Sequence, residues 1–398
     1  MKKILLSNIS FFGCYGGIEN SLRFLAKEYL LMGMEVLIFT GYNRNIENGS
    51  NFKRKDTLDG ITHYRFMYKP FKRRLFNILF LPLIPLDILY ALCLIKKENI
   101  TYSVSRNQFV CFFINIFFSS INRYLAPGFS SYQSSREFLG RSGIASSIKR
   151  KIHNFFDLRA ICHSSQIAVF SNNMLYQADC ILKASNTKFN ISNIKLFKPG
   201  VDKYLFHPIS TVQKASVRKA LKLPYDKKLI LCVGRFVSAK GFDIAIQSMK
   251  YLGKENTTLV IVGDGDLFNE YSEMIEQNNL TDSVILVGAT NKTALYYQAC
   301  DYFFMSSIYE PLGQTILEAI SSGLPVIAFD QEVVLTATEE ILGENIFVSL
   351  PSLEPTSIAT FIRKLPNVEQ DIYITASNQA LSLSKKYDWS VLAHNLID

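Results

Sequence analysis

Short apolar runs alternate with amphipathic stretches along the chain. Residues 3–8 predict a first strand that leads into a glycine-rich turn, and in residues 19–32 the apolar positions recur at helical spacing. Gly33 follows this periodic stretch, so we expect it to end a helix, and residues 35–40 predict a second strand. A strand, a glycine turn, a helix and another strand are typical of the start of a doubly wound α/β domain.

The alternation continues through the first half of the chain and restarts near residue 200. A chain of 398 residues is also too long for one ordinary core. We therefore expect an α/β protein of two Rossmann-like domains, residues 1–199 and 200–385, with the active site in the cleft between them. The further predicted strands are 61–66, 100–105, 123–126, 167–171, 228–233, 258–262, 284–287, 302–305 and 325–329.

Composition excludes a globally disordered chain and points to an anionic partner. The chain is 48% hydrophobic and 19% charged, with 43 Lys and Arg against 34 Asp and Glu, which gives a net charge of +9. Residues 1–199 hold 27 basic and 11 acidic residues, whereas residues 200–398 hold 16 and 23. The first half is therefore the half expected to meet an anionic surface.

The cysteine and histidine patterns predict neither disulfides nor a metal site. The seven cysteines include no CxxC pair, and the five histidines include no HExxH motif. We expect a chain kept in a reducing cytoplasm, without structural zinc. The apolar start at residues 1–6 is broken at Ser7 and Asn8 and lacks a cleavage site, so it favours a first strand over a signal peptide.

Residues 75–95 are the strongest candidate for membrane contact. They are apolar except for Asn77 and Asp87, and a charge near the bilayer centre costs about 2.5–3.5 kcal/mol, which disfavours a spanning helix. Two interpretations stay open: a buried helix beneath the sheet, or an edge that dips into a membrane. Residues 109–118 are similarly apolar but too short to span, and predict core. The basic residues that would meet an anionic leaflet are Lys69, Lys72, Arg73 and Arg74.

The most informative stretch for chemistry is residues 306–327. It begins after a predicted strand, turns at Pro311 and Gly313, and continues as a helix. Ligands of open α/β sheets sit at such turns, and the amides of a helix N-terminus can hold a diphosphate. Glu310 and Glu318 are eight residues apart, which places one carboxylate on the loop and the other in the helix. One could then meet a sugar and the other a ribose diol.

With these motifs the chain resembles a known family, the retaining glycosyltransferases of family 4 (group 1). That family has the GT-B fold, in which two Rossmann-like domains face each other across a cleft and the last helix crosses back to the first domain. The resemblance covers nearly the whole chain and places the crossing helix at residues 386–398, anchored by Trp389. The motifs that carry it, in order, are Gly16-Gly17-Ile18-Glu19, Lys198-Pro199-Gly200-Val201-Asp202, Val233-Gly234-Arg235-Phe236 with Lys240-Gly241, Ile261-Val262-Gly263-Asp264-Gly265, and the string from Glu310 to Glu318.

The resemblance implies a role for each matching residue. Arg235 and Lys240 would pair with the donor diphosphate as the sugar–phosphate bond breaks, because fixed cations stabilise the charge that develops there. Glu310 would contact the transferred sugar, and Glu318 the ribose. The other implied donor-binding residues are Gly16 and Gly17 beside the phosphates, Gly288 and Ala289 beside the base, and Gly313, Gln314 and Thr315 at the helix start.

Two features differ from what glycosyltransferases commonly show. Asp264-Gly265-Asp266 looks like the Asp-x-Asp metal motif of the other glycosyltransferase fold, but it follows a strand within the family's glycine loop. We therefore expect a turn there, and neither a catalytic metal nor a cofactor. Many relatives carry a histidine after a strand of the first domain, whereas residues 125–129 contain none. Ser130 and Ser131 are the candidates for replacing it.

The resemblance implies a metal-independent hexosyltransferase that moves a sugar from a nucleoside diphosphate to a glycan or lipid-linked glycan with retention. Bacterial relatives often build surface polysaccharide, so we expect a role in lipopolysaccharide O-antigen, capsule or exopolysaccharide synthesis, peripherally bound at the inner face of the cytoplasmic membrane. The alternatives are a sugar-nucleotide epimerase of the same fold and a non-catalytic membrane-surface scaffold. Residues 13–17 do not form GxGxxG, which disfavours a dehydrogenase, and no nucleic-acid motif accompanies the basic residues.

Overall fold

The chain forms two compact units. The computed structural model describes residues 1–11, 17–44, 53–132, 144–253, 256–343 and 347–398. The N-terminal domain comprises Met1–Lys198 together with Trp389–Asp398, and the C-terminal domain comprises Pro199–Asp388. The division after residue 198 lies one residue from the predicted boundary, and the returning segment begins three residues after its predicted start.

An eight-stranded sheet forms the centre of the N-terminal domain. The strands follow the order β3-β4-β2-β1-β5-β6-β7-β8, and all neighbours are parallel except the β3–β4 hairpin. In β1 and β2 nearly every residue is buried, as expected for a parallel sheet covered on both faces. The strands are β1 (Lys3–Ser7), β2 (Glu35–Tyr42), β3 (Lys55–Leu58), β4 (Ile61–Met67), β5 (Tyr102–Ser105), β6 (Asn122–Leu125), β7 (Gln166–Val169) and β8 (Ile194–Leu196).

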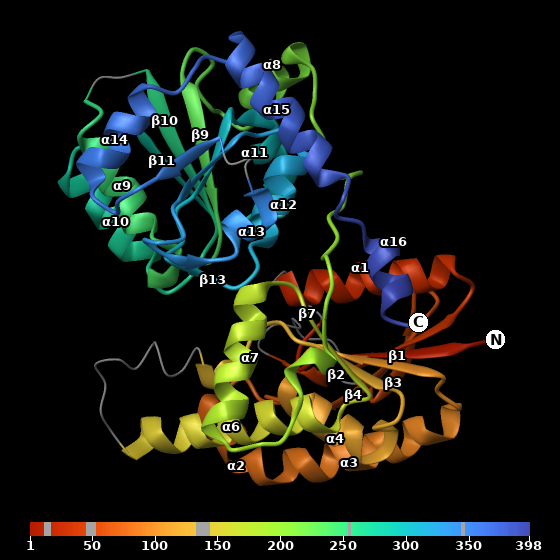
Figure 1. Cartoon of the computed structure of the whole chain (residues 1–398). Helices are drawn as coiled ribbons and strands as arrows, with labels where there is room; N and C mark the ends of the chain where they lie inside the picture. The colour runs from red at the N-terminus through yellow and green to blue at the C-terminus, as the bar shows by residue number, and fades with distance from the viewer. Residues whose placement is uncertain (12–16, 45–52, 133–143, 254–255, 344–346) are drawn as a thin grey trace. The chain divides into compact units, whose positions relative to one another are not determined.

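Helices cover both faces of this sheet, with α1 (Gly17–Leu31) on one side and α3 (Ile84–Ile95) and α4 (Gln108–Phe118) on the other (Figure 1). α1 buries Leu22, Leu25 and Tyr29, and each such side chain contributes about 1.5–3 kcal/mol when it leaves water. Asn107 caps α4 by accepting hydrogen bonds from two amides of its first turn. The other helices of this domain are α2 (Arg74–Phe80), α6 (Ile144–His163), α7 (Asn172–Ala184) and the 3₁₀ turns η1 (Leu81–Leu83), η2 (Lys96–Glu98) and η3 (Ile191–Asn193).

The chain returns to the N-terminal domain as α16 (Trp389–Asn395). The indole of Trp389 stacks on Phe24 of α1 with ring centroids 5.2 Å apart. The Tyr29 hydroxyl donates a hydrogen bond of 3.1 Å to the carbonyl of Ala393. Because these contacts are buried and aromatic, Trp389 fixes the returning helix on α1, as expected from the sequence.

A six-stranded, fully parallel sheet forms the centre of the C-terminal domain. Its strand order is β11-β10-β9-β12-β14-β16, so the order reverses once, between β9 and β12. All six residues of β10 are buried, as expected for a parallel strand that is covered on both faces. The strands are β9 (Lys228–Val233), β10 (Thr257–Val262), β11 (Val284–Gly288), β12 (Tyr302–Met305), β14 (Val326–Phe329) and β16 (Val348–Leu350), with a separate pair β13 (Tyr309–Glu310) and β15 (Leu335–Thr336).

Two apolar clusters fill the two sides of this sheet. One cluster joins the sheet to α8, α11 and α12, and the other joins it to α9, α10 and α14. Together they form a three-layer α/β/α sandwich, the arrangement expected for a Rossmann-like domain. The helices are α8 (Thr211–Ala220), η4 (Ser238–Lys240), α9 (Phe242–Lys250), α10 (Phe268–Gln277), α11 (Thr293–Ala299), α12 (Gln314–Ser321), α13 (Thr338–Leu342), α14 (Pro355–Arg363) and α15 (Asp371–Ser384).

The apolar segment 75–95 divides into two helices with different surroundings. By length and composition, Arg74–Glu98 is the one candidate membrane span in the described chain. Its second half, α3, packs beneath the sheet, and the buried Asp87 accepts hydrogen bonds from Arg54 and from the amide of Met67, both at 2.6 Å. Its first half, α2, buries none of its residues. The interpretation as a buried helix is therefore correct for α3 only, because α2 is an exposed apolar helix.

Candidate functional site

The candidate site lies where the strand order of the C-terminal sheet reverses. β9 and β12 are neighbours, and the chain leaves them toward helices on opposite faces. The loops after these two strands, 234–241 and 306–313, therefore meet at the carboxyl edge of the sheet. The amide of Ile308 donates to the carbonyl of Ala239 at 3.0 Å, and the Ser306 hydroxyl donates to the carbonyl of Lys240 at 2.8 Å. Such a crossing point is where open α/β sheets bind ligands.

Lys240 and Glu310 form an ion pair at this point. The Lys240 Nζ donates to one carboxylate oxygen of Glu310, and the two side chains are only 17% and 16% exposed. The amide of Gly313 donates to the other oxygen at 3.3 Å. The backbone of Glu310 is fixed as well, because its carbonyl accepts from the amide of Ala337 at 3.0 Å. A cation and a carboxylate are thus held in place before any ligand arrives.

Two glycines make this close approach feasible. Gly241 has φ +59°, and a Cβ there would lie 2.2 Å from the carbonyl oxygen of Ser306. Gly313 has φ +87° directly before α12, and a Cβ there would lie 2.8 Å from the Ile316 side chain. Because both positions need left-handed backbone and lack room for a side chain, only glycine fits without strain.

Glu318 lies one turn into α12 and is partly buried. The Tyr297 hydroxyl donates to its carboxylate at 2.9 Å. Burial raises the pKa of Glu318 to about 7, although the Tyr297 hydrogen bond and the charge of Lys240 act in the opposite direction. A carboxyl group that titrates near neutral pH can accept hydrogen bonds from a diol once it is ionised. Sequence reasoning missed Tyr297, which lies in a core-like run of α11 without any motif.

The remaining predicted donor-site residues occupy separate positions on the C-terminal domain. The side chain of Arg235 is exposed and forms no hydrogen bond or ion pair with the described residues. Gln314 donates to the carbonyl of Gly200 at 2.9 Å, and the Thr315 hydroxyl contacts the sulfur of Met305 at 3.9 Å. Gly288 ends β11, two strands away from β9, and Ala289 is exposed beside it. Lys240, Glu310, Gly313 and Glu318 are therefore the predicted residues that the structure brings together.

The Asp264-Gly265-Asp266 segment forms a turn after β10. A carboxylate oxygen of Asp264 accepts from the amide of Gly265 at 2.8 Å. Within the described ranges, no group of three His, Cys, Asp or Glu side chains is spaced to hold a metal ion.

The N-terminal domain contributes fewer predicted residues. Gly16 lies outside the described residues, and Gly17 is the first residue of α1. Both serines proposed to replace the family histidine are already engaged: Ser130 Oγ accepts from Gln108 at 2.6 Å, while Ser131 Oγ donates to Asp157 at 2.7 Å. The Ser131 hydroxyl therefore already donates its proton to Asp157, whereas the Ser130 hydroxyl accepts from Gln108 and keeps its own proton to donate.

An exposed apolar and basic surface surrounds α2. Asn77 ties this helix to the preceding loop, since its side chain bonds both the amide and the carbonyl of Phe71, at 3.1 and 2.7 Å. Leu75 and Leu79 are 69% and 68% exposed. We call this region the α2 surface, and it consists of the exposed Leu75, Phe76, Ile78, Leu79, Leu81 and Leu83 with Lys69, Lys72, Arg73 and Arg74.

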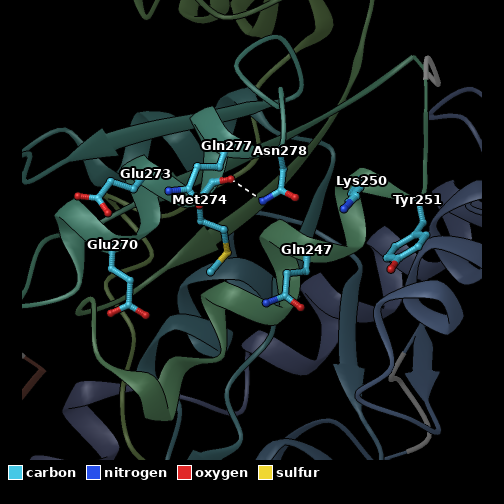
Figure 2. Close-up of a pocket in the computed structure, with 8 residues that line it drawn as sticks. All are labelled: Gln247, Lys250, Tyr251, Glu270, Glu273, Met274, Gln277 and Asn278. Atoms are coloured by element: carbon cyan, nitrogen blue, oxygen red, sulfur yellow. Dashed lines mark hydrogen bonds between the residues drawn. The ribbon is translucent and has the colours of Figure 1, made fainter.

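A groove between α9 and α10 lies apart from the candidate site (Figure 2). Lys250 and Gln247 line one side, and Glu270 and Glu273 line the other. None of the predicted site residues lines it, so we assign it no role in donor binding.

Comparison with known families agrees with the geometry of the C-terminal domain. Residues 213–366 match the model of the family described as glycosyl transferases group 1. This segment is similar to the group 1 glycosyltransferases. It contains Arg235, Lys240, Glu310 and Glu318, all four of the charged residues assigned to donor binding.

Curated relatives match part of this chain. An uncharacterized glycosyltransferase of Methanocaldococcus jannaschii, MJ1607, is 27% identical over 265 residues, covering 65% of this chain and 66% of the relative. The alpha-monoglucosyldiacylglycerol synthase of Streptococcus pneumoniae is 35% identical over 116 residues, covering 28% and 26%. The matched segments thus span less than two thirds of these relatives' own lengths.

Solved structures resemble the whole chain. Sucrose-phosphate synthase from Thermosynechococcus elongatus has a TM-score of 0.78 at 18% identity, covering 99% of this chain and 97% of that one. Alr3699/HepE of Anabaena, in complex with UDP-glucose, has a TM-score of 0.75 at 18% identity, covering 100% and 98%. At this identity the similarity establishes the fold, and the chain has the GT-B fold expected from its sequence.

Proposed function

We propose that this protein is a retaining glycosyltransferase that moves a hexose-type sugar from a nucleoside diphosphate to a glycan or lipid-linked glycan. The observation that carries the proposal is the preformed Lys240–Glu310 pair at the switch point of a domain similar to the group 1 glycosyltransferases. The UDP-glucose bound to the Anabaena protein supports a nucleotide-sugar donor. The glycolipid synthase of Streptococcus pneumoniae supports an acceptor in glycolipid or surface-polysaccharide synthesis, such as O-antigen, capsule or exopolysaccharide.

In the proposed reaction, Lys240 and Arg235 bind the donor diphosphate and stabilise its charge as it leaves. Glu310 binds hydroxyls of the transferred sugar, and Glu318 accepts hydrogen bonds from the ribose diol. The bond between the sugar C1 and the phosphate oxygen breaks while a bond from C1 to the acceptor oxygen forms on the same face. Because the new bond forms on the face that the phosphate leaves, configuration is retained. The acceptor's proton passes to the departing phosphate. Lys240 and Arg235 stabilise the developing charge, so the proposed reaction needs no metal.

Donor binding and donor consumption together test this assignment. Purified protein is melted in the presence of a panel of nucleoside-diphosphate sugars, because a ligand bound only by the folded state raises the melting temperature. We expect one donor to stabilise the chain and to release its nucleoside diphosphate when acceptor glycan is added, also in EDTA. Failure of every donor to stabilise the chain would contradict the assignment. Isomerisation of the donor without acceptor would instead identify an epimerase.

We further propose that the α2 surface binds an anionic membrane leaflet from the cytoplasmic side. Exposed leucines beside basic side chains suit the interface of an anionic bilayer, where apolar insertion and charge attraction add. Donor activity does not require this contact, so the two proposals are separable.

Vesicle co-sedimentation tests the membrane proposal. At low salt we expect binding to phosphatidylglycerol vesicles and none to phosphatidylcholine vesicles. Replacing Lys72, Arg73 and Arg74 with Ser should abolish the binding, whereas replacing the exposed C-terminal-domain residues Lys219 and Lys222 with Ser should leave it intact. Equal binding by both variants would refute the α2 surface as the contact.

A further inference from the structure

The described chain contains three arginines with buried side chains, and they differ in whether a carboxylate compensates the guanidinium charge. Arg65, Arg106 and Arg218 are 6%, 3% and 7% exposed. Arg218 Nη2 donates to both carboxylate oxygens of Asp301 at 2.8 Å, and Arg65 donates to Asp56 at 2.7 Å. A buried charge is costly unless an opposite charge and hydrogen bonds compensate it. Arg65 and Arg218 meet that requirement within the protein.

Arg106 has no such partner among the described residues. Its Nη1 donates to the carbonyl of Leu125 at 2.9 Å, and the guanidinium lies over the ring of Phe170, 5.2 Å from the centroid. Its Nε is buried and makes no hydrogen bond, and no described carboxylate forms an ion pair with it. The charge of Glu19 acts on the guanidinium without an ion pair, and a carboxylate oxygen of Glu19 accepts a hydrogen bond from Ser10.

The unpaired guanidinium is nevertheless charged at neutral pH. Burial lowers the pKa of Arg106 to about 10, and the fields of Tyr124 and Glu19 oppose this only in part. The side chain therefore stays a cation in an environment that disfavours one. An anion that reached it would relieve this cost.

Arg106 also occupies the position where a ligand is expected. It directly follows β5, which neighbours β1, and the strand order of the N-terminal sheet reverses between these two strands. The amide of Arg106 donates to the carbonyl of Ser7 at the end of β1, at 2.8 Å. Asn8, Asn107 and Ser171 follow β1, β5 and β7 at the same edge. This edge is thus rich in polar groups, as ligand-binding edges of open sheets are.

We propose that Arg106 binds an oxyanion of a substrate, a phosphate or a carboxylate, through the Nε and Nη2 edge of its guanidinium. Nη1 is occupied by Leu125, whereas that second edge forms no hydrogen bond within the described chain. The planar fork of Nε and Nη2 matches the two oxygens of such a group. The site is additional to the donor site of the C-terminal domain. Its anion comes either from the donor or from a phosphate or carboxylate on the acceptor.

Phosphate binding to the full chain tests the site. The parent protein carries Arg235→Met and Lys240→Met, which remove the cations of the candidate donor site, and inorganic phosphate is titrated by calorimetry. We expect the parent to bind phosphate, Arg106→Lys to weaken the affinity about tenfold because the fork is lost, and Arg106→Met to abolish it. Arg123→Lys, a partly buried arginine on β6 of the same sheet, should bind as the parent does.

Two results would overturn the proposal: a parent that binds no phosphate, or an Arg106→Lys protein that binds phosphate as tightly as the parent. If Arg106→Met fails to fold, the lysine variant decides. The source of the anion follows from titrating UDP into the protein with Arg235 and Lys240 intact. Weaker UDP binding in Arg106→Lys assigns the anion to the donor, and unchanged UDP binding with lost phosphate binding assigns it to the acceptor.

Discussion

The two domains have similar sheets, but the charges at their two switch points are held in different ways. In the C-terminal domain, Lys240 is paired with Glu310 and both are tied to the backbone around them. In the N-terminal domain, Arg106 is more deeply buried and has no described carboxylate beside it. The charge of Lys240 is compensated without a ligand, whereas the charge of Arg106 would be compensated only by a bound anion. Arg106 differs in the same way from Arg218, whose charge is compensated by Asp301 inside the domain.

Loss of a structural arginine should have the largest effect on stability. Arg218→Met removes the bidentate partner of the buried Asp301 and leaves that carboxylate with Lys214 at 2.6 Å and the amide of Leu229, which should lower the free energy of unfolding by about 3 kcal/mol. Arg106→Met strands no carboxylate and should change it by about 1 kcal/mol or less. Urea unfolding of both variants measures the difference. Equal losses would show that Arg106 is as structural as Arg218 and would remove the contrast.

Loss of Glu310 should have the largest effect on catalysis. Glu310→Ala removes the group assigned to the sugar and releases Lys240, so transfer should fall about 10²- to 10³-fold. Release of nucleoside diphosphate in the presence of acceptor measures it. Glu332→Ala, an exposed glutamate of the same domain, is the matched control and should keep full activity. Transfer at the normal rate by Glu310→Ala would refute the assigned role.

The buried Asp157 should make the stability of the N-terminal domain depend on pH. Burial raises its pKa to about 6 despite two hydrogen bonds from Ser131, so the folded state favours the protonated form. Its stabilising contribution is complete below pH 3.8 and is lost as the pH rises through about 6, a change of about 3 kcal/mol.

Asp157→Asn keeps an acceptor for Ser131 but cannot ionise. Relative to the wild type, this variant should therefore gain stability between pH 4 and pH 8. Unfolding curves at the two pH values measure that gain. If the variant and the wild type lose stability in parallel over this range, Asp157 does not titrate in the folded state as described.

Glu318 should make donor binding depend on pH, with a smaller effect in free energy than that of Asp157 on stability. Its pKa of about 7 means that the ionised form, which accepts from the ribose, grows about tenfold between pH 6 and pH 8. UDP affinity should rise over this range in the wild type. The Glu318→Gln protein controls for titration of the UDP phosphate itself and should show a flatter profile. Identical profiles would mean that Glu318 does not contact the ribose.

The sequence predicts the C-terminal site better than the N-terminal one. β9 and β12 are predicted at their observed bounds, because parallel strands buried over most of their length contain long apolar runs. The Glu310 string falls in one continuous segment, so spacing alone places its residues. β3 and β8 were not predicted, since each is a short strand at an edge of the sheet with little apolar patterning.

The role of Arg106 and the split of the apolar segment depend on packing that no local pattern carries. A charged residue after a strand reads as solvated, and only the fold shows that Arg106 is buried without a carboxylate beside it. Likewise, α2 and α3 belong to one apolar stretch of the sequence. Only the position of the sheet shows that Ile88 and Leu92 are core, whereas Leu75 and Leu79 face solvent. Tyr297 was missed for the same reason: its hydrogen-bond partner Glu318 lies on another helix, so no local pattern marks the pair.

UDP titration tests the central claim most directly, that the Lys240–Glu310 pair forms part of a nucleotide-sugar donor site. The titration compares the wild type with Lys240→Met and with Lys250→Met, an exposed lysine of the adjoining helix α9. The account predicts that Lys240→Met binds UDP about tenfold more weakly or worse, because a charge-assisted bond to phosphate is lost, while Lys250→Met binds as the wild type does. Equal UDP affinity in all three proteins would contradict it.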